Sequence, residues 1–307
     1  MATYNGEKFI EAQIDSLLNQ TYQNWHLMVR DDGSIDQTVY ILKTYKKQFP
    51  DKISILESKE HLGACLNFGE LLKHSTADYV MFCDQDDIWL PEKIKVSFNG
   101  ILHLEDKYGK EKPLLLFTDL TVVDKDLTVM AKSFWGYEKI NPDNTTVNRL
   151  LVQNVVTGCT SIINKKLKSL SVPVPPEAII HDWWIALVAS VFGHTDYNSV
   201  PMVLYRQHGQ NDVGARKRGL REALKKSITF ETSINKIKEL KYKTQIQALS
   251  FYRNYQSQPI EDAKKLSLVG MYSEMDKMSF FERKMFILNN KLLFGDLPRT
   301  FAEILFY

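Results

Sequence analysis

The sequence contains few cysteines and lacks long hydrophobic runs. Its three cysteines, Cys65, Cys83 and Cys159, lie far apart in a chain of 307 residues. Their spacing fits neither a disulfide framework nor a metal-binding pair, so we expect a reducing compartment. No apolar stretch approaches the roughly 18–20 residues that a membrane-spanning helix needs, and no signal peptide opens the chain. These absences predict a cytoplasmic protein.

The composition is that of a folded globular protein. Hydrophobic residues make up 44% of the chain and charged residues 25%, which is enough material for a large core. The net charge of +2 hides an asymmetry, because residues 214–307 carry 18 Lys and Arg but only 10 Asp and Glu. We therefore predict a basic helical region over residues 213–307 that faces an anionic partner.

Segments with strand-like and helix-like hydrophobic periods alternate in the first third of the chain. The predicted strands are residues 25–29, 53–56 and 79–83, and the predicted helices are residues 7–20, 36–49, 63–73 and 92–108. This alternation predicts an α/β fold with a mostly parallel sheet flanked by helices. Ligands bind such sheets beyond the carboxyl ends of the strands. Polar clusters at residues 3–5, 31–36 and 84–87 follow strands and therefore predict a ligand site.

The segment Asp84-Gln85-Asp86-Asp87 places three carboxylates directly after the strand predicted at residues 79–83. Like charges at the end of a buried strand need a positive partner. A hard divalent cation suits them, since Mg²⁺ and similar ions pair one or two carboxylates with substrate phosphates. The cluster therefore predicts an enzyme that handles a phosphorylated donor. The alternative is a solvated turn whose aspartates cap the helix after Pro91.

The order and spacing of these segments resemble the family 2 glycosyltransferases, which have the GT-A fold. The resemblance covers residues 1–212 and rests on Thr3-Tyr4-Asn5-Gly6, Asp31-Asp32-Gly33-Ser34-Ile35-Asp36, Gly63 with Asn67, Asp84-Gln85-Asp86-Asp87, and Asp182 ahead of aromatic residues. It implies a donor half over residues 1–110 and an acceptor half over residues 111–212. Family members usually have several apolar residues before the Thr-Tyr-Asn segment, so we expect a shortened first strand or a true start upstream of Met1.

Three segments narrow the resemblance to one branch of that family. Residues 84–89, 181–184 and 205–211 look most like bacterial rhamnosyltransferases that build surface polysaccharide. The resemblance implies a metal-dependent inverting transferase, with Mg²⁺ or Mn²⁺ as cofactor, that moves L-rhamnose from dTDP-L-rhamnose to a saccharide or lipid-linked acceptor. Three alternatives stay open: a UDP-hexose donor, a nucleotidyltransferase lacking its usual Gly-rich loop, and a non-catalytic sugar-binding or scaffold protein.

The resemblance implies a metal site and a diphosphate site on the donor side. Asp86 is the expected metal ligand, and His208 is a further candidate ligand. Asp84 is expected to reach the ribose hydroxyls or a metal-bound water, and Asp87 to orient its neighbours or cap a helix. Arg206 is expected to grip the diphosphate. For Arg206 and His208 the alternative is an ordinary surface loop.

The nucleobase is expected at Asp32, whose carboxylate would accept a hydrogen bond from the imide N–H of thymine or uracil. The other residues that the resemblance places along the base, ribose or phosphate are Thr3, Tyr4, Asn5, Gly63 and Asn67. The structural alternatives are a tight turn at Asp32, a loop between strand and helix, and a plain helix start.

Asp182 is the expected catalytic base, which would take the proton of the acceptor hydroxyl. Trp183 and Trp184 follow it and are expected to form an apolar platform for the sugar. The alternative is that Asp182 caps its helix and both tryptophans belong to the core. His181 is a weaker candidate for sharing the base role, and Cys159 is assigned to packing because no activating group surrounds it.

The C-terminal region combines basic and apolar residues. Residues 216–243 hold ten Lys and Arg against three Glu. Apolar side chains then lie among Arg283, Lys284 and Lys291: Phe280, Phe281, Met285, Phe286, Leu288, Leu292, Leu293 and Phe294. This pattern favours helices on the inner face of an anionic membrane, where a lipid-linked acceptor would be presented. A helical dimer or docking domain is the equally weighted alternative, and a nucleic-acid partner is not expected.

Overall fold

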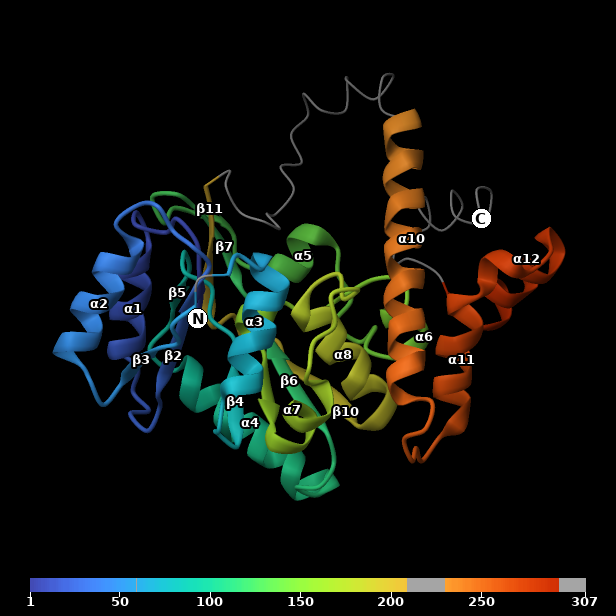
Figure 1. Ribbon diagram of the computed structural model, residues 1–307, viewed down its shortest axis with the longest axis horizontal. Coiled ribbons are helices and arrows are strands. Elements are labelled where there is room, and N and C mark those ends of the chain that lie inside the picture. Colours follow the sequence, from blue (N-terminus) through green and yellow to red (C-terminus); the bar gives the residue numbers. More distant parts are fainter. Residues whose placement is uncertain (59, 209–229, 293–307) are drawn as a thin grey trace.

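The computed structural model describes residues 1–58, 60–208 and 230–292, which form an α/β body with helices at its C-terminal end (Figure 1). The first sheet is parallel, in the order β1 (Ala2–Thr3), β2 (Leu27–Asp31), β3 (Ile53–Ile55). Helices α1 (Ile10–Leu18) and α2 (Thr38–Gln48) connect these strands. The predicted α/β fold is confirmed, and β1 is short, as expected.

Hydrophobic periodicity explains the elements of this first layer. In α1 the side chains of Ile10, Ile14 and Leu17 recur every three or four residues and are buried on one face. In β2, Leu27 and Val29 are buried at alternate positions, as expected for a strand. These residues belong to one core cluster, so α1 packs against the parallel sheet.

The second sheet mixes strand directions. Its order is β10 (His194–Asn198), β6 (Leu114–Thr118), β9 (Ile162–Asn164), β4 (Tyr79–Met81). β10 runs parallel to β6, whereas β9 is antiparallel to both of its neighbours, β6 and β4. Parallel pairing therefore describes the first sheet, while antiparallel pairs enter the fold in its second half.

The third sheet brings two distant segments together. Its order is β5 (Ile88–Trp89), β11 (Val203–Gln207), β7 (Thr121–Asp124), β8 (Val129–Ala131). The pairing of β5 with β11 places Trp89 opposite Val203. The acidic segment just before β5 thereby meets the residues around the end of β11, and this contact builds the candidate site.

The other helices cover the sheets. They are α3 (Gly63–His74), α4 (Lys93–Tyr108), α5 (Phe134–Glu138), α6 (Val147–Leu150), α7 (Lys165–Ser171) and α8 (His181–Phe192), with a 3-10 turn, η1, at Gly158–Thr160. All residues of α8 from His181 to Val191 are buried. A helix that is apolar on all sides belongs inside a protein, so α8 is the central helix of the largest core cluster.

The C-terminal region is helical, as predicted. It contains α10 (Phe230–Tyr255), α11 (Ala263–Ser273), the 3-10 turn η2 (Met275–Lys277) and α12 (Phe280–Asn289). Phe251 and Tyr255 of α10 pack against Trp184, with ring centroids 5.3 and 5.9 Å apart. The predicted domain boundary at residue 212, the basic residues 216–229, and Leu293 and Phe294 lie outside the described residues. In the described part of the chain, no helix is both long and apolar enough to cross a membrane.

Candidate active site

Gln85 joins two of the loops that form the site. Its side-chain Oε1 accepts a hydrogen bond from the backbone N of Tyr4 at 2.9 Å, and its Nε2 donates to the Tyr4 carbonyl at 2.9 Å. This paired contact links the loop after β1 to the acidic segment after β4. Two of the three polar clusters predicted from the sequence therefore meet at this point.

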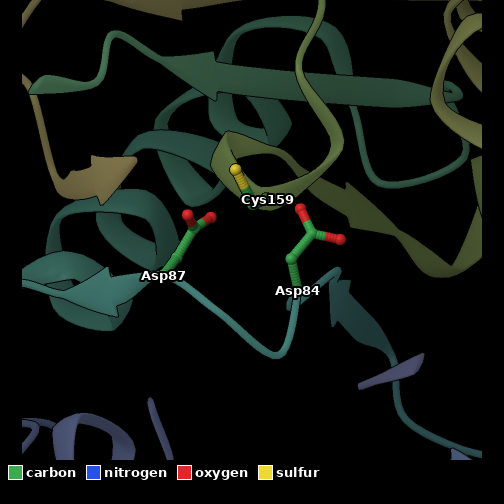
Figure 2. A group of neighbouring side chains, drawn as sticks. All are labelled: Asp84, Asp87 and Cys159. Atoms are coloured by element: carbon green, nitrogen blue, oxygen red, sulfur yellow. The ribbon is translucent and has the colours of Figure 1, made fainter. Parts of the chain in front are cut away.

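Asp84 and Asp87 lie on either side of the Cys159 thiol (Figure 2). One ligand atom from each of these three residues lies within 4.8 Å of the others. Burial, followed by the charges of Asp86 and Asp182, raises the pKa of Asp84 to about 7. Burial also raises the pKa of Asp87 well above its usual value, and that carboxylate accepts a hydrogen bond from the backbone N of Arg206 at 3.2 Å.

Asp86 and His208 come together although 122 positions separate them. His208 Nε2 lies 2.7 Å from Asp86 Oδ2, and both side chains are largely buried. The His208 ring stacks on Phe9 with centroids 4.5 Å apart. Arg206 holds this corner, since its Nε donates to the Asp86 carbonyl at 2.9 Å and its Nη1 to the Lys125 carbonyl at 2.8 Å. Its expected contact with a diphosphate stays a prediction.

The donor set suits Mg²⁺ or Mn²⁺, which prefer carboxylate oxygens and, for Mn²⁺, tolerate imidazole. Asp86 and His208 offer a carboxylate oxygen and an imidazole nitrogen 2.7 Å apart, and the charge of Asp86 acts on the neighbouring Asp84. The Cys159 thiol is a poor ligand for hard cations, and burial raises its pKa well above the usual value, so it stays protonated. Asp86 with His208 therefore remains the preferred ligand pair, and Cys159 remains a packing residue.

Asp32 lies next to the end of β2 and is only 2% exposed. Its Oδ1 accepts hydrogen bonds from Arg30 Nη1 at 2.8 Å and Leu62 N at 2.9 Å. Its Oδ2 accepts one from Gly63 N at 2.7 Å, and the His61 Nδ1 lies 3.1 Å away. Gly63 has φ +76°, a backbone conformation that favours glycine, so this residue is suited to turning its N–H toward Asp32.

Among the other residues expected around the nucleotide, Tyr4 and Asn5 are exposed. Tyr4 is 49% exposed, and its ring centroid lies 5.0 Å from that of His61. Thr3 is buried and donates its hydroxyl to Asp31 Oδ1 at 2.8 Å. The Asn5 side chain accepts a hydrogen bond from Ile35 N at 2.9 Å. Thr3 and Asn5 thus support the loops, and their contact with a nucleotide stays a prediction.

Asn67 is buried next to Arg30. Its Oδ1 accepts a hydrogen bond from Arg30 Nη1 at 3.0 Å, and its Nδ2 donates to the Arg30 carbonyl at 3.2 Å. The amide is therefore engaged with the protein, and its expected contact with ribose or phosphate stays a prediction.

Asp182 lies at the start of α8 and is buried. Its Oδ1 accepts a hydrogen bond from Asn154 Nδ2 at 2.9 Å, and its Oδ2 accepts one from Gly158 N at 2.8 Å. Burial is the main cause that raises the pKa of Asp182 to about 7, against the lowering effect of these bonds. A Cβ added to Gly158 would lie 2.8 Å from His181 Nε2 and 3.2 Å from Asp182 Oδ2. Only glycine allows this close approach.

His181 and the two tryptophans are core residues of α8. The His181 ring stacks on Phe68, with centroids 4.1 Å apart, and burial lowers the pKa of His181 to about 3. Trp184 is 0% exposed and donates to the Ser171 carbonyl at 3.2 Å. Trp183 is also buried. This placement matches the alternative in which both tryptophans are core residues and does not support a platform for the sugar.

The sequence-based prediction missed Arg30, Gln85 and Asn154, which bond to the predicted residues. Arg30 carried a local signal, because a charged residue within an otherwise apolar strand is rarely unpaired. The other two carried none, since their contacts join segments far apart in the chain.

Comparison with known proteins identifies related glycosyltransferases. Residues 1–105 match the profile of the family described as "Glycosyl transferase family 2". The dTDP-rhamnosyl transferase RfbG of Shigella flexneri is 30% identical over 222 residues, which cover 70% of this chain and 74% of that protein. The UDP-Glc:alpha-D-GlcNAc-diphosphoundecaprenol beta-1,3-glucosyltransferase WfgD of Escherichia coli is 28% identical over 163 residues, covering 53% of this chain and 57% of that protein.

Solved structures show the same fold at lower sequence identity. S. aureus TarS in complex with UDP-GlcNAc superposes with a TM-score of 0.56 at 17% identity, over 94% of this chain and 77% of that chain. The mannosyltransferase PcManGT from Pyrobaculum calidifontis, in complex with GDP-Man and Mn²⁺, gives a TM-score of 0.51 at 15% identity, over 100% of this chain and 79% of that chain.

Proposed function

Because the chain belongs to glycosyl transferase family 2, we propose that it is a metal-dependent inverting glycosyltransferase that transfers L-rhamnose from dTDP-L-rhamnose to a surface polysaccharide or lipid-linked acceptor. One observation carries the proposal. The pair Asp86 and His208, the carboxylate of Asp84 and the buried base candidate Asp182 gather in one electrostatically coupled region. A transferase of this kind needs a site that holds the diphosphate of the donor and a catalytic base that deprotonates the acceptor.

Asp182 acts as the base in this proposal. Its pKa of about 7 leaves a large fraction ionised at neutral pH while keeping the carboxylate basic enough to accept a proton. Hydrogen bonds from Asn154 and Gly158 fix its orientation. The acceptor hydroxyl passes its proton to Asp182 as its oxygen bonds to the anomeric carbon. Attack opposite the leaving group inverts that centre, so a β-linked donor gives an α-linked product.

In this proposal Asp86 and His208 would hold the cation, and Asp84 would face the ribose. A bound Mg²⁺ or Mn²⁺ would supply charge neutralisation for the departing nucleoside diphosphate. Arg206 keeps the Asp86 segment in place through its bond to that residue's carbonyl oxygen. Asp32 and Tyr4 bind the nucleobase of the donor. Asp32 accepts a hydrogen bond from it, and Tyr4 offers its exposed ring.

The choice of donor rests on relatives. The 30% identical protein is named a dTDP-rhamnosyl transferase, which favours dTDP-L-rhamnose. The 28% identical protein is named for UDP-Glc, which makes a UDP-hexose the alternative. We would measure calorimetric binding of dTDP-rhamnose, UDP-glucose and UDP-galactose, each with and without Mn²⁺. Metal-dependent binding of dTDP-rhamnose alone supports the proposal, preference for a UDP-sugar changes the donor, and binding of none contradicts donor recognition.

The C-terminal helices suit an anionic membrane that presents a lipid-linked acceptor. Helix α12 exposes Phe280, Phe281, Met285 and Leu288, and Lys284 Nζ lies 5.0 Å from the Phe280 ring centroid. Exposed apolar side chains beside cations favour the interface of a bilayer. A helical dimer through the same face is the alternative, and vesicle binding, described in the Discussion, distinguishes the two.

A further inference from the structure

A buried arginine organises the nucleotide end of the site. Arg30 lies in β2 and is 2% exposed. Its Nη1 donates hydrogen bonds to Asp32 Oδ1 at 2.8 Å and to Asn67 Oδ1 at 3.0 Å. Its Nη2 donates to Ser58 Oγ at 2.7 Å and to the Glu60 carbonyl at 2.8 Å. One guanidinium group therefore ties β2 to α3 and to the chain that leads into α3.

The geometry requires arginine in particular. A guanidinium presents donors in a rigid plane, so it bonds to several acceptors in fixed directions. A lysine ammonium at position 30 is a point charge on a flexible stem and would not reproduce this set of bonds. The Arg30 carbonyl also accepts a hydrogen bond from Asn67 Nδ2 at 3.2 Å, which locks the strand to the helix.

These bonds leave Asp32 with little freedom. An ionised carboxylate offers about four acceptor positions. Three of them receive donors from the protein: Arg30 Nη1, Leu62 N and Gly63 N. The fourth, on Oδ2, lies 3.1 Å from Nδ1 of His61, which is also 2.7 Å from the Asp32 carbonyl oxygen; the His61 side chain is 63% exposed. With respect to the described residues, this is the position left for a donor from a ligand.

We propose that Arg30 is a positioning residue for base recognition, because it fixes Asp32 so that one acceptor position on Oδ2 is kept for a ligand. That position suits the imide N–H of uracil or thymine. The inference rests on the proposed pyrimidine nucleotide donor. Without Arg30, Asp32 loses its fixed orientation and the protein loses its ability to sense the imide hydrogen, while contacts to the diphosphate remain.

The test compares UDP with N3-methyl-UDP, which lacks the imide hydrogen, by calorimetry in the presence of Mn²⁺. We expect the wild-type protein to bind UDP more tightly by about 10- to 100-fold, the range for a hydrogen bond to a charged group. In Arg30→Met this ratio should fall to about one. A merely structural role would weaken both ligands equally and leave the ratio unchanged, so the ratio separates the two roles.

Arg30→Met leaves a buried carboxylate without its partner, so this variant is at risk of unfolding. Arg30→Lys is a second variant, because it keeps a positive charge next to Asp32 but not the guanidinium's set of bonds, and its ratio should also fall. Ser58→Ala is the matched control, because it removes one Nη2 partner but keeps the bond to Asp32. It should retain the wild-type ratio.

The outcomes separate this inference from the proposed function. If the wild-type protein binds no uridine or thymidine nucleotide, the proposed donor class fails and the inference fails with it. If the wild-type protein binds both ligands equally, donor binding stands but Asp32 and Arg30 do not recognise the imide. If Arg30→Met or Arg30→Lys keeps a tenfold preference for UDP, only the positioning role of Arg30 is overturned.

Discussion

Replacing Asp182 by asparagine tests the base assignment directly. The change keeps the size of the side chain but removes its ability to accept a proton. Loss of a general base typically reduces turnover by 10²- to 10⁴-fold. We expect kcat of Asp182→Asn to fall within that range, while donor affinity changes little because the donor-side contacts belong to other residues.

The pH profile gives a sharper test of the same residue. With a pKa of about 7, only about 10% of Asp182 is ionised at pH 6, so wild-type kcat should fall about tenfold between pH 8 and pH 6. Asp84 also has a pKa of about 7, so the wild-type profile alone is ambiguous. The residual activity of Asp182→Asn should lack the acidic limb if Asp182 causes it.

The same pKa predicts an effect on stability with the opposite pH dependence. The pKa of Asp182 in the folded protein lies above its usual 3.8, so the folded state holds the proton more tightly than the unfolded state. The stability that this proton contributes is present below about pH 4 and is lost as pH rises through 7. The cost at pH 8 is at most about 4 kcal/mol, from about three pKa units at 1.36 kcal/mol each.

Asp182→Asn should therefore raise Tm at pH 8 and have less effect at pH 5. The gain is expected to be about 1–2 kcal/mol, because the new amide must face its NH₂ toward one of two donors, Asn154 Nδ2 or Gly158 N. The assay is release of nucleoside diphosphate at saturating donor and Mn²⁺ from pH 5.5 to 8.5, with Tm measured in the same buffers.

Asp119→Asn is the matched control for these measurements. Asp119 is buried and accepts hydrogen bonds from Leu120 N and Phe134 N, neither of which is a predicted site residue. This variant should keep the acidic limb of the pH profile even if it is less stable. Two results would refute the reasoning: an Asp182→Asn protein with unchanged kcat, or a residual activity that keeps the wild-type acidic limb.

Three further predictions test other parts of the molecule. Asp86→Asn should weaken Mn²⁺ binding at least tenfold, measured by Mn²⁺ titration, and unchanged affinity would remove this ligand assignment. Gly158→Ala should lower kcat and destabilise the fold by about 1–3 kcal/mol, because the added methyl group meets buried polar atoms, and wild-type activity and Tm would contradict this. Phe281→Ser/Met285→Ser should reduce sedimentation with anionic vesicles, whereas Tyr40→Ser, an exposed aromatic on α2, should not. If the double variant sediments like the wild type but no longer forms a dimer, the exposed face of α12 is a dimer interface instead.

The first half of the fold was predictable because its signals are local. Buried residues repeat every three or four positions in α1 and every two in β2, and the sequence shows both periods directly. The order of the polar segments then predicted the GT-A fold, which the solved relatives confirm. Each of these inferences needed only neighbouring residues or the order of motifs along the chain.

Three strands, β5, β8 and β10, were not predicted from the sequence, and two of them show why. β10 consists of His194, Thr195, Asp196, Tyr197 and Asn198, which are half-buried at a sheet edge and lack an alternating apolar pattern. β5 is only two residues long, so it carries no period at all. Their pairing is decided by contacts with strands from elsewhere in the chain, and a local pattern cannot reveal those contacts.

The tryptophans of α8 show a signal that was present in the sequence but misinterpreted. Residues 181–192 are apolar on nearly every side of the helix, and such a helix belongs in the core. The resemblance drew attention to Trp183 and Trp184 as a platform next to the base. Periodicity alone would have placed both inside, where Trp184 meets Phe251 of α10.

For Asp32 the sequence predicts the type of interaction but not how the protein itself uses the carboxylate. A carboxylate in that position predicts an acceptor, and the sequence contains nothing that says how many of its acceptor positions the protein itself uses. Donors from the protein fill three of them, and the guanidinium of Arg30 is the only charged donor among these three. The specificity of such a site then depends on the donors behind the recognition residue, so Arg30 should be as sensitive to substitution as Asp32 when base discrimination is measured.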